Sequence, residues 1–167
     1  LKEATLTKAN LLEATLTEAD LEQATLTKAN LWKATLTEAN LQQATLTEAN
    51  LYKATLTEAD LRYATLTKAD LRYATLTEAN LRYATLTEAD LSQATLIGTK
   101  FDKAKLQSAT SEVDGKTVTL SAAKLDGCIF TDASFANTNL TGTSMMAIED
   151  KAPVFTLYAP PAKRAPT

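Results

Sequence analysis

The chain has 167 residues and a net charge of −3, with 17 basic and 20 acidic residues. This balance excludes a strong electrostatic attraction to nucleic acid or to anionic membranes. The sequence contains no histidine, and its single cysteine, Cys128, excludes an internal disulfide. No apolar run is long enough to span a bilayer, so we expect neither a membrane span nor a direct nucleic-acid partner.

From Leu1 to Thr95 the sequence repeats every ten residues, and each ten divides into two related fives. Leucine begins each five, and alanine lies two residues before the next leucine. So strict a period is typical of a repeat architecture, in which one unit explains most of the chain. A helix does not fit, because five residues turn an α-helix by roughly 140° and the leucines would form no apolar stripe.

A short strand followed by a corner fits the period. In a strand, Ala14 and Leu16 face one way, while Thr15 and Thr17 face the other. Ala19 has the wrong parity, so the chain must turn a corner once in every five residues to bring it inside. Thr-Leu-Thr units alternate with Asn/Asp-Leu units, and therefore four sides, in a coil of about twenty residues, stack like units on each other.

The unit Ala-(Asn/Asp/Thr)-Leu-x-x resembles that of the pentapeptide-repeat family. The resemblance runs from Leu1 to about Leu106 and resumes from about Leu120 to Met145. It implies an all-β fold, a right-handed quadrilateral parallel β-helix, in which the leucine and the residue two before it point inward. At four fives per coil, we expect about seven coils stacked roughly 4.8 Å apart.

Four regions follow from the pattern. Residues 1–110 are predicted to form the regular β-helix, with Phe101 in place of a core leucine. The frame breaks at 111–119, where Asp114-Gly115 between β-branched residues predicts an inserted hairpin. Degenerate repeats follow at 120–146, with Cys128 packed inside, and then a capping segment and proline-rich tail at 147–167. Because Leu1 lies within a repeat, we expect further residues to precede it.

Nothing in the sequence favours catalysis. There is no glycine-rich phosphate loop and no cluster with metal-ligand spacing, so we expect no enzyme activity, no cofactor, no metal and no small-molecule substrate. Carboxylates do stack in one column, and we interpret them as solvated surface charges set by repeat duplication; these are Glu18, Glu38, Glu58 and Glu78.

The two variable positions after each Asn/Asp-Leu are the candidate contact residues, and we expect them on two opposite faces. Tryptophan, tyrosine and arginine are the residue types that anchor protein interfaces. The same residues also have a structural explanation, because rings stack between coils and arginine packs on tyrosine. The candidates are Leu12, Trp32, Tyr52, Arg72 and Tyr73 on one face and Arg62, Tyr63, Arg82 and Tyr83 on the other.

Two alternatives stay open beside protein binding. A rigid grid of outward threonines resembles the ice-binding face of β-helical antifreeze proteins, although threonine also suits exposed strand positions. Some quinolone-resistance members of the pentapeptide-repeat family mimic duplex DNA and inhibit type II topoisomerases. In this sequence, however, lysine and arginine interrupt the acidic columns. The ice-binding candidates are Thr15, Thr17, Thr35, Thr37, Thr55, Thr57, Thr75 and Thr77.

The sequence thus predicts a non-catalytic structural or protein-binding scaffold. Its expected partner is another protein, its oligomeric state is open, and its expected location is the cytoplasm.

Overall fold

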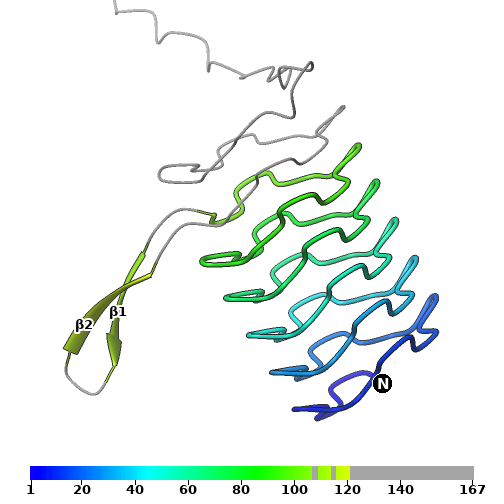
Figure 1. The fold of residues 1–167 in the computed structure, drawn as a ribbon, viewed down its shortest axis with the longest axis horizontal. Helices are drawn as coiled ribbons and strands as arrows, with labels where there is room; N and C mark the ends of the chain where they lie inside the picture. Colours follow the sequence, from blue (N-terminus) through cyan, green and yellow to red (C-terminus); the bar gives the residue numbers. More distant parts are fainter. Residues whose placement is uncertain (107–108, 114–115, 121–167) are drawn as a thin grey trace, which may run out of the picture.

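The computed structural model describes residues 1–106, 109–113 and 116–120. Residues 1–106 wind into a stack of four-sided coils, one above another (Figure 1). Within this part of the chain each coil takes twenty residues, because parallel bridges join Thr5 to Thr25, Asn10 to Asn30 and every later pair twenty apart. The predicted register, with threonine on threonine and Asn or Asp on Asn or Asp, is confirmed up to Thr95.

Each side of a coil contributes one residue to isolated β-bridges with the coils on either side. The Leu16 N–H donates to the Thr35 C=O at 2.7 Å, and the Thr35 N–H donates to the Ala14 C=O at 2.9 Å. Each side therefore adds one residue pair to a parallel ladder before the chain turns. Continuous pairing along the stack, rather than long strands, satisfies the backbone.

The corners are tight turns of two residues. At one of them the Ala14 N–H donates to the Leu11 C=O at 3.0 Å, and Glu13 has a φ of 54°. A type II turn spans four residues and requires a positive φ at the third of them, where glycine is the usual residue. Here twenty described residues other than glycine adopt it, each at a cost of roughly 1–2 kcal/mol. The strained residue is held in place because its own N–H donates to the next coil, as the Glu13 N–H does to the Trp32 C=O at 2.8 Å.

The interior is a column of leucine and alanine. From Leu21 to Leu96 the described leucines that begin each five have no exposed surface, and the alanines are at most 1% exposed. Phe101 takes a leucine position and is fully buried, as predicted. Thr99 takes an alanine position, and its hydroxyl donates to the Leu76 C=O at 2.7 Å, which satisfies the one polar group that it brings inside.

Asparagine and aspartate recur for a backbone reason. The Oδ1 of Asn50 accepts the N–H of Tyr52 at 3.1 Å, and the Asn50 amide donates to Asn30 at 3.4 Å. The first bond forms an Asx turn and satisfies the Tyr52 N–H, which has no backbone partner in the ladder. The same turn recurs at Asn10, Asp20, Asn30, Asn40, Asp60, Asp70, Asn80 and Asp90.

Two expectations about the surface are wrong. The variable positions lie at corners rather than on faces, because the two residues after each leucine form the turn. For the same reason Thr15, Thr35, Thr55 and Thr75 lie on a flat side, but the second threonine of each pair begins a corner. The outward threonines therefore do not form the single flat grid that the ice-binding alternative expects; the corner residues are Thr17, Thr37, Thr57 and Thr77.

Beyond the coils, β1 (Ala109–Val113) pairs with β2 (Lys116–Leu120) in antiparallel register, with Ser111 opposite Val118. The pair projects away from the stack (Figure 1). Several predicted features lie outside the described residues, namely the Asp114-Gly115 turn, Cys128, the degenerate repeats of 120–146 after Leu120 and the segment 147–167. The expected total of seven coils is therefore not tested.

Candidate functional site

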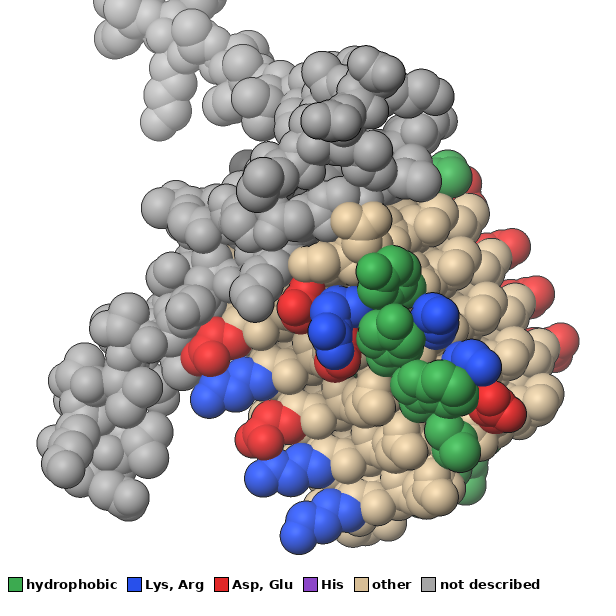
Figure 2. Space-filling model, viewed as in Figure 1, with side chains coloured by type: hydrophobic (Ala, Val, Ile, Leu, Met, Phe, Trp, Pro, Cys, Tyr) green, Lys and Arg blue, Asp and Glu red, His purple; other side chains and the backbone are tan. Residues whose placement is uncertain are grey.

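Four corner columns run along the stack, and their chemistry differs. We call the first aromatic corner the column of Leu12, Glu13, Trp32, Lys33, Tyr52, Lys53, Arg72 and Tyr73, and the second aromatic corner the column of Arg62, Tyr63, Arg82, Tyr83 and Lys103. The acidic corner contains Glu18, Glu38, Glu58 and Glu78, and the mixed corner contains Lys8, Lys28, Glu48, Lys68 and Glu88. Figure 2 shows a column of hydrophobic side chains in the middle of one face, with acidic side chains along its right edge.

The first aromatic corner is a chain of ring and cation contacts. The rings of Tyr52 and Tyr73 meet edge to face, with centroids 5.4 Å apart. Lys53 lies 5.5 Å from the centroid of Tyr52 and 5.9 Å from that of Tyr73. Arg72 lies 5.4 Å from the centroid of Tyr52, and Lys33 lies 4.1 Å from that of Trp32. These cation–π contacts hold the cations beside the rings and leave their charge near the surface.

The second aromatic corner is a stack of two parallel rings. Tyr63 and Tyr83 lie with centroids 4.7 Å apart and an interplanar angle of 7°. Lys103 extends the column, because its ammonium group donates to the Tyr83 hydroxyl at 3.1 Å. The stacking spans one coil step, so it also ties neighbouring coils together.

Each arginine of the two corners has a carboxylate partner, and the sequence decides which one. The Nη2 groups of Arg62 and Arg72 lie 2.6 Å from the aspartates two residues earlier. Arg82 follows an asparagine at that position, and its Nε instead donates to Asp102 on the next coil at 2.9 Å. These pairs fix the direction of the guanidinium groups more than they add stability, because the three arginine side chains are 41%, 47% and 47% exposed.

The Asp70–Arg72 pair changes the titration of both groups. Burial by itself would raise the pKa of Asp70, but hydrogen bonds from the side chain and backbone of Arg72, together with its charge, outweigh it and hold the pKa of Asp70 below its usual value. The hydrogen bond and charge of Asp70 raise the pKa of Arg72. Asp60 raises the pKa of Arg62 in the same way. Asp70, Arg72 and Arg62 are therefore ionised at neutral pH.

Three of the four tyrosines in these corners expose much of their surface. Tyr63 is 54% exposed, Tyr73 51%, Tyr83 40% and the neighbouring Leu12 48%. Trp32 and Tyr52 are half-buried under the cations that lie over them. Rings that are already ordered lose little further entropy on binding, which makes them good anchors.

The two charged corners differ in how their charges are paired. On the mixed corner Lys28 lies 3.3 Å from Glu48, and Lys68 lies 3.8 Å from Glu88. On the acidic corner four glutamates follow one another on successive coils, and no ion pair between described residues involves them. This corner is thus a continuous line of negative charge with no internal cation.

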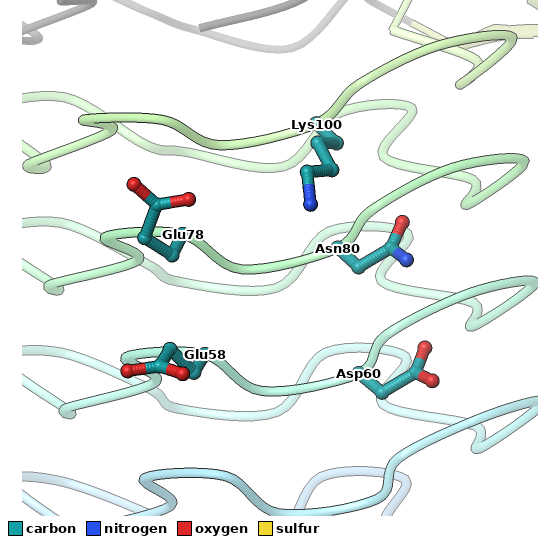
Figure 3. A pocket seen from close by; sticks show the side chains of 5 residues that line it. All are labelled: Glu58, Asp60, Glu78, Asn80 and Lys100. Carbon is teal, nitrogen blue, oxygen red and sulfur yellow. The ribbon is translucent and has the colours of Figure 1, made fainter. Parts of the chain in front are cut away.

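A shallow hollow lies beside the acidic corner. Glu58 and Glu78 line it from the corner, Asp60 and Asn80 from the next side, and Lys100 reaches toward the coil that carries Glu78 (Figure 3). Within the described part of the chain no group of three or more His, Cys, Asp or Glu is arranged to hold a metal ion. The described residues also include no helix long and apolar enough to cross a membrane.

The structure brings each predicted set of contact residues into one column. Leu12, Trp32, Tyr52, Arg72 and Tyr73 share the first aromatic corner, and Arg62, Tyr63, Arg82 and Tyr83 share the second. Three lysines that lie against these rings are not among the predicted contact residues, namely Lys33, Lys53 and Lys103. Their signal was present, because each lies one residue from an aromatic side chain or twenty residues from one.

The repeat itself decides the family. The family model for pentapeptide repeats matches the chain in eight copies, over residues 1–32, 34–72, 74–110 and 118–147. The chain belongs to the pentapeptide repeat family. Its fold is therefore the right-handed β-helix of this family, in agreement with the twenty-residue coils of the structure. No curated protein sequence matches the chain.

Several solved structures are similar. HetL, a pentapeptide repeat protein involved in heterocyst differentiation regulation from the cyanobacterium Nostoc, is 32% identical over 87% of this chain and 73% of its own, with a TM-score of 0.31. A pentapeptide repeat protein from the thylakoid lumen of Arabidopsis thaliana is 28% identical over 63% of this chain and 68% of its own, with a TM-score of 0.37.

QnrB1, a plasmid-mediated fluoroquinolone resistance protein, is 18% identical over 82% of this chain and 65% of its own, with a TM-score of 0.44. The match to this pentapeptide repeat protein therefore spans about two thirds of its length.

Proposed function

We propose that this pentapeptide repeat protein is a non-catalytic scaffold that binds another protein through its two aromatic corners. The observation that carries the proposal is the exposure of ordered rings at those corners, with Tyr63 and Tyr73 more than half exposed although both contact other rings. Tyrosine, tryptophan and arginine in such clusters are the residue types that supply most binding energy at protein interfaces. The rigid coil stack beneath them holds the anchors at fixed spacing.

Replacing Trp32 and Tyr52 together by serine tests the first aromatic corner. The immobilised chain is exposed to an extract of its source, the captured proteins are identified, and the affinity for each is then measured with purified components. We expect the double variant to bind at least about tenfold more weakly, because it removes the two half-buried anchors of this corner.

The matched variant replaces Tyr63 and Tyr83 by serine at the second aromatic corner and reports which corner a given partner uses. Both variants leave the leucine core intact, so their circular dichroism and unfolding midpoint serve as the folding control. If both variants capture the same proteins with native affinity, the aromatic corners are not the contact surface.

The two alternatives and the location have separate tests. Shaping of ice crystals by the purified chain would favour the flat side of Thr15, Thr35, Thr55 and Thr75, and inhibition of gyrase supercoiling would favour DNA mimicry by the acidic corner. A cytoplasmic location belongs to the same proposal as the protein partner, and fractionation of source cells tests it.

A further inference from the structure

The first aromatic corner and the acidic corner are neighbours on every coil. In each coil they are separated by one side, whose outward residue is a threonine; these are Thr15, Thr35, Thr55, Thr75 and Thr95. Figure 2 shows the hydrophobic column with cations beside it and the acidic column to its right. A cationic ladder and an anionic ladder thus border one flat and uncharged side.

The two ladders match in position on three coils of the stack, whereas the first coil carries a glutamate at both corners, Glu13 and Glu18. Cations of the first aromatic corner occur on three successive coils, at Lys33, Lys53 and Arg72. Within the chain Lys33 lies 3.4 Å from Glu13 and Arg72 lies 2.6 Å from Asp70, so a second copy would share these two cations with their internal partners. Glutamates of the acidic corner occur on the same three coils, at Glu38, Glu58 and Glu78. Because the parallel bridges set one coil spacing for all columns, both ladders have the same period.

We propose that the chain forms a side-by-side dimer with a second copy of itself, in which the first aromatic corner of each copy lies against the acidic corner of the other. With the threonine sides facing each other, a two-fold axis parallel to the stack places the two ladders opposite each other twice and in register. Lys33 then faces Glu38, and Lys53 faces Glu58, in both halves of the interface.

Charge complementarity and periodicity together favour a second copy over other partners. The four glutamates of the acidic corner repel one another within a single chain, and a cation from outside relieves that repulsion. A second coil stack of the same chain offers cations at the same spacing over three coils. The side beyond the acidic corner does not suit such a dimer, because it carries Asp20, Asp60 and Lys100 instead of threonine.

This inference rests on the proposed function only in treating the first aromatic corner as a contact surface. A second copy would compete with a different protein for the first aromatic corner, and the second aromatic corner, with Tyr63 and Tyr83, stays open to that protein. Since the dimer is measured with the purified chain alone, its failure would leave the capture of another protein untouched, and the converse also holds.

Charge reversal provides the test. The full chain is measured by sedimentation velocity over a concentration series at low and at high salt, and we expect a dimer that weakens as salt screens the ladders. The variants Lys33→Glu/Lys53→Glu and Glu38→Lys/Glu58→Lys should each raise the dimer dissociation constant at least about tenfold, because each places like charges opposite one another.

Mixing the two variants gives the decisive result. In a mixed dimer, both corner pairs again join opposite charges, so the mixture should dimerise with near-native affinity while each variant alone does not. The matched control swaps a pair on the mixed corner, Lys28→Glu/Glu48→Lys, and should leave the dimer unchanged.

The neutral variants Lys33→Gln/Lys53→Gln and Glu38→Gln/Glu58→Gln replace the reversals if circular dichroism shows that a reversed chain is unfolded, and each should weaken the dimer. A chain that stays monomeric at low salt, or a mixture that fails to regain the dimer, would overturn the proposal.

Discussion

At the residue scale, the corner residues carry the unusual chemistry of this chain. The second residue of each corner has a positive φ whether it is Glu, Lys, Gln or Tyr, and Gly98 is the one glycine among the described corners. Even there the Glu78 side chain lies over the backbone, with its Oε1 2.5 Å from where a Cβ would be. The corner conformation is therefore imposed by the stack and not by local preference.

Gln42 and Gln43 offer a matched test of that strain. They are adjacent and chemically identical, but only Gln43 has a positive φ, of 57°. Replacement of either by glycine raises the entropy of the unfolded chain equally, so this contribution cancels. The difference between the variants then reports the strain at Gln43 together with the packing lost at half-buried Gln42. We expect Gln43→Gly to be more stable than Gln42→Gly by about 1–2 kcal/mol in denaturant unfolding. Equal stabilities would show that the corner is unstrained.

The pKa of Asp70 gives a second prediction at this scale. Because Arg72 holds this pKa below its unfolded-state value, the pair stabilises the fold at pH values above the unfolded-state pKa, and the stabilisation is lost as the pH falls through the folded-state pKa. Replacing Arg72 by glutamine should raise the pKa of Asp70, measured by NMR titration of its carboxyl carbon. The variant Arg82→Gln, which removes a bond to Asp102 instead, should leave it in place.

At the scale of the element, one coil side joined to one corner is the unit of stability. Leu6 and Leu46 occupy the same column, but Leu46 is fully buried between two coils while Leu6 is only partly buried in the first. Truncation of a buried leucine costs the transfer free energy and leaves a cavity, whereas a partly exposed one loses less.

We therefore expect Leu46→Ala to lower the free energy of unfolding by about 2–5 kcal/mol and Leu6→Ala by less than half of that. Urea unfolding of both variants measures the difference. Similar losses would mean that Leu6 is covered in solution by something other than the described coils.

At the scale of the whole molecule, the structure is close to one-dimensional. Each described coil contacts its neighbours through the same ladder, so stability accumulates by nearest-neighbour terms and the end coil opens most easily. This geometry also gives each corner a straight column of side chains along the stack, which is what makes a long contact surface possible.

Hydrogen exchange should reveal this gradient. The N–H groups of Leu6 and Leu46 each donate to the next coil at 2.7 Å, so their bonds are equivalent and only their position differs. We expect Leu6 to exchange by local opening and Leu46 only by larger unfolding, with a difference of several orders of magnitude in protection. Equal protection of the two amides would show that the coils unfold as one cooperative unit.

The sequence by itself determined the coil. Leucine every five residues and alanine two before it fix which residues face inward. The alternation of threonine with Asn or Asp fixes the four sides and the twenty-residue register. Both follow from the sequence because each is a local pattern repeated many times. It also placed the candidate contact residues in the correct columns, since positions twenty apart stack.

Only the tertiary structure decided where the corners lie and which side chains meet across coils. Thr17 and its equivalents begin corners because the backbone turns directly after each leucine, which parity alone does not locate. Lys53 lies beside the rings of Tyr52 and Tyr73, and Arg82 donates to Asp102. These contacts form because each side chain adopts the rotamer that packs against its neighbours on adjacent coils. Such contacts depend on distances between chain segments, and no one-dimensional pattern contains them.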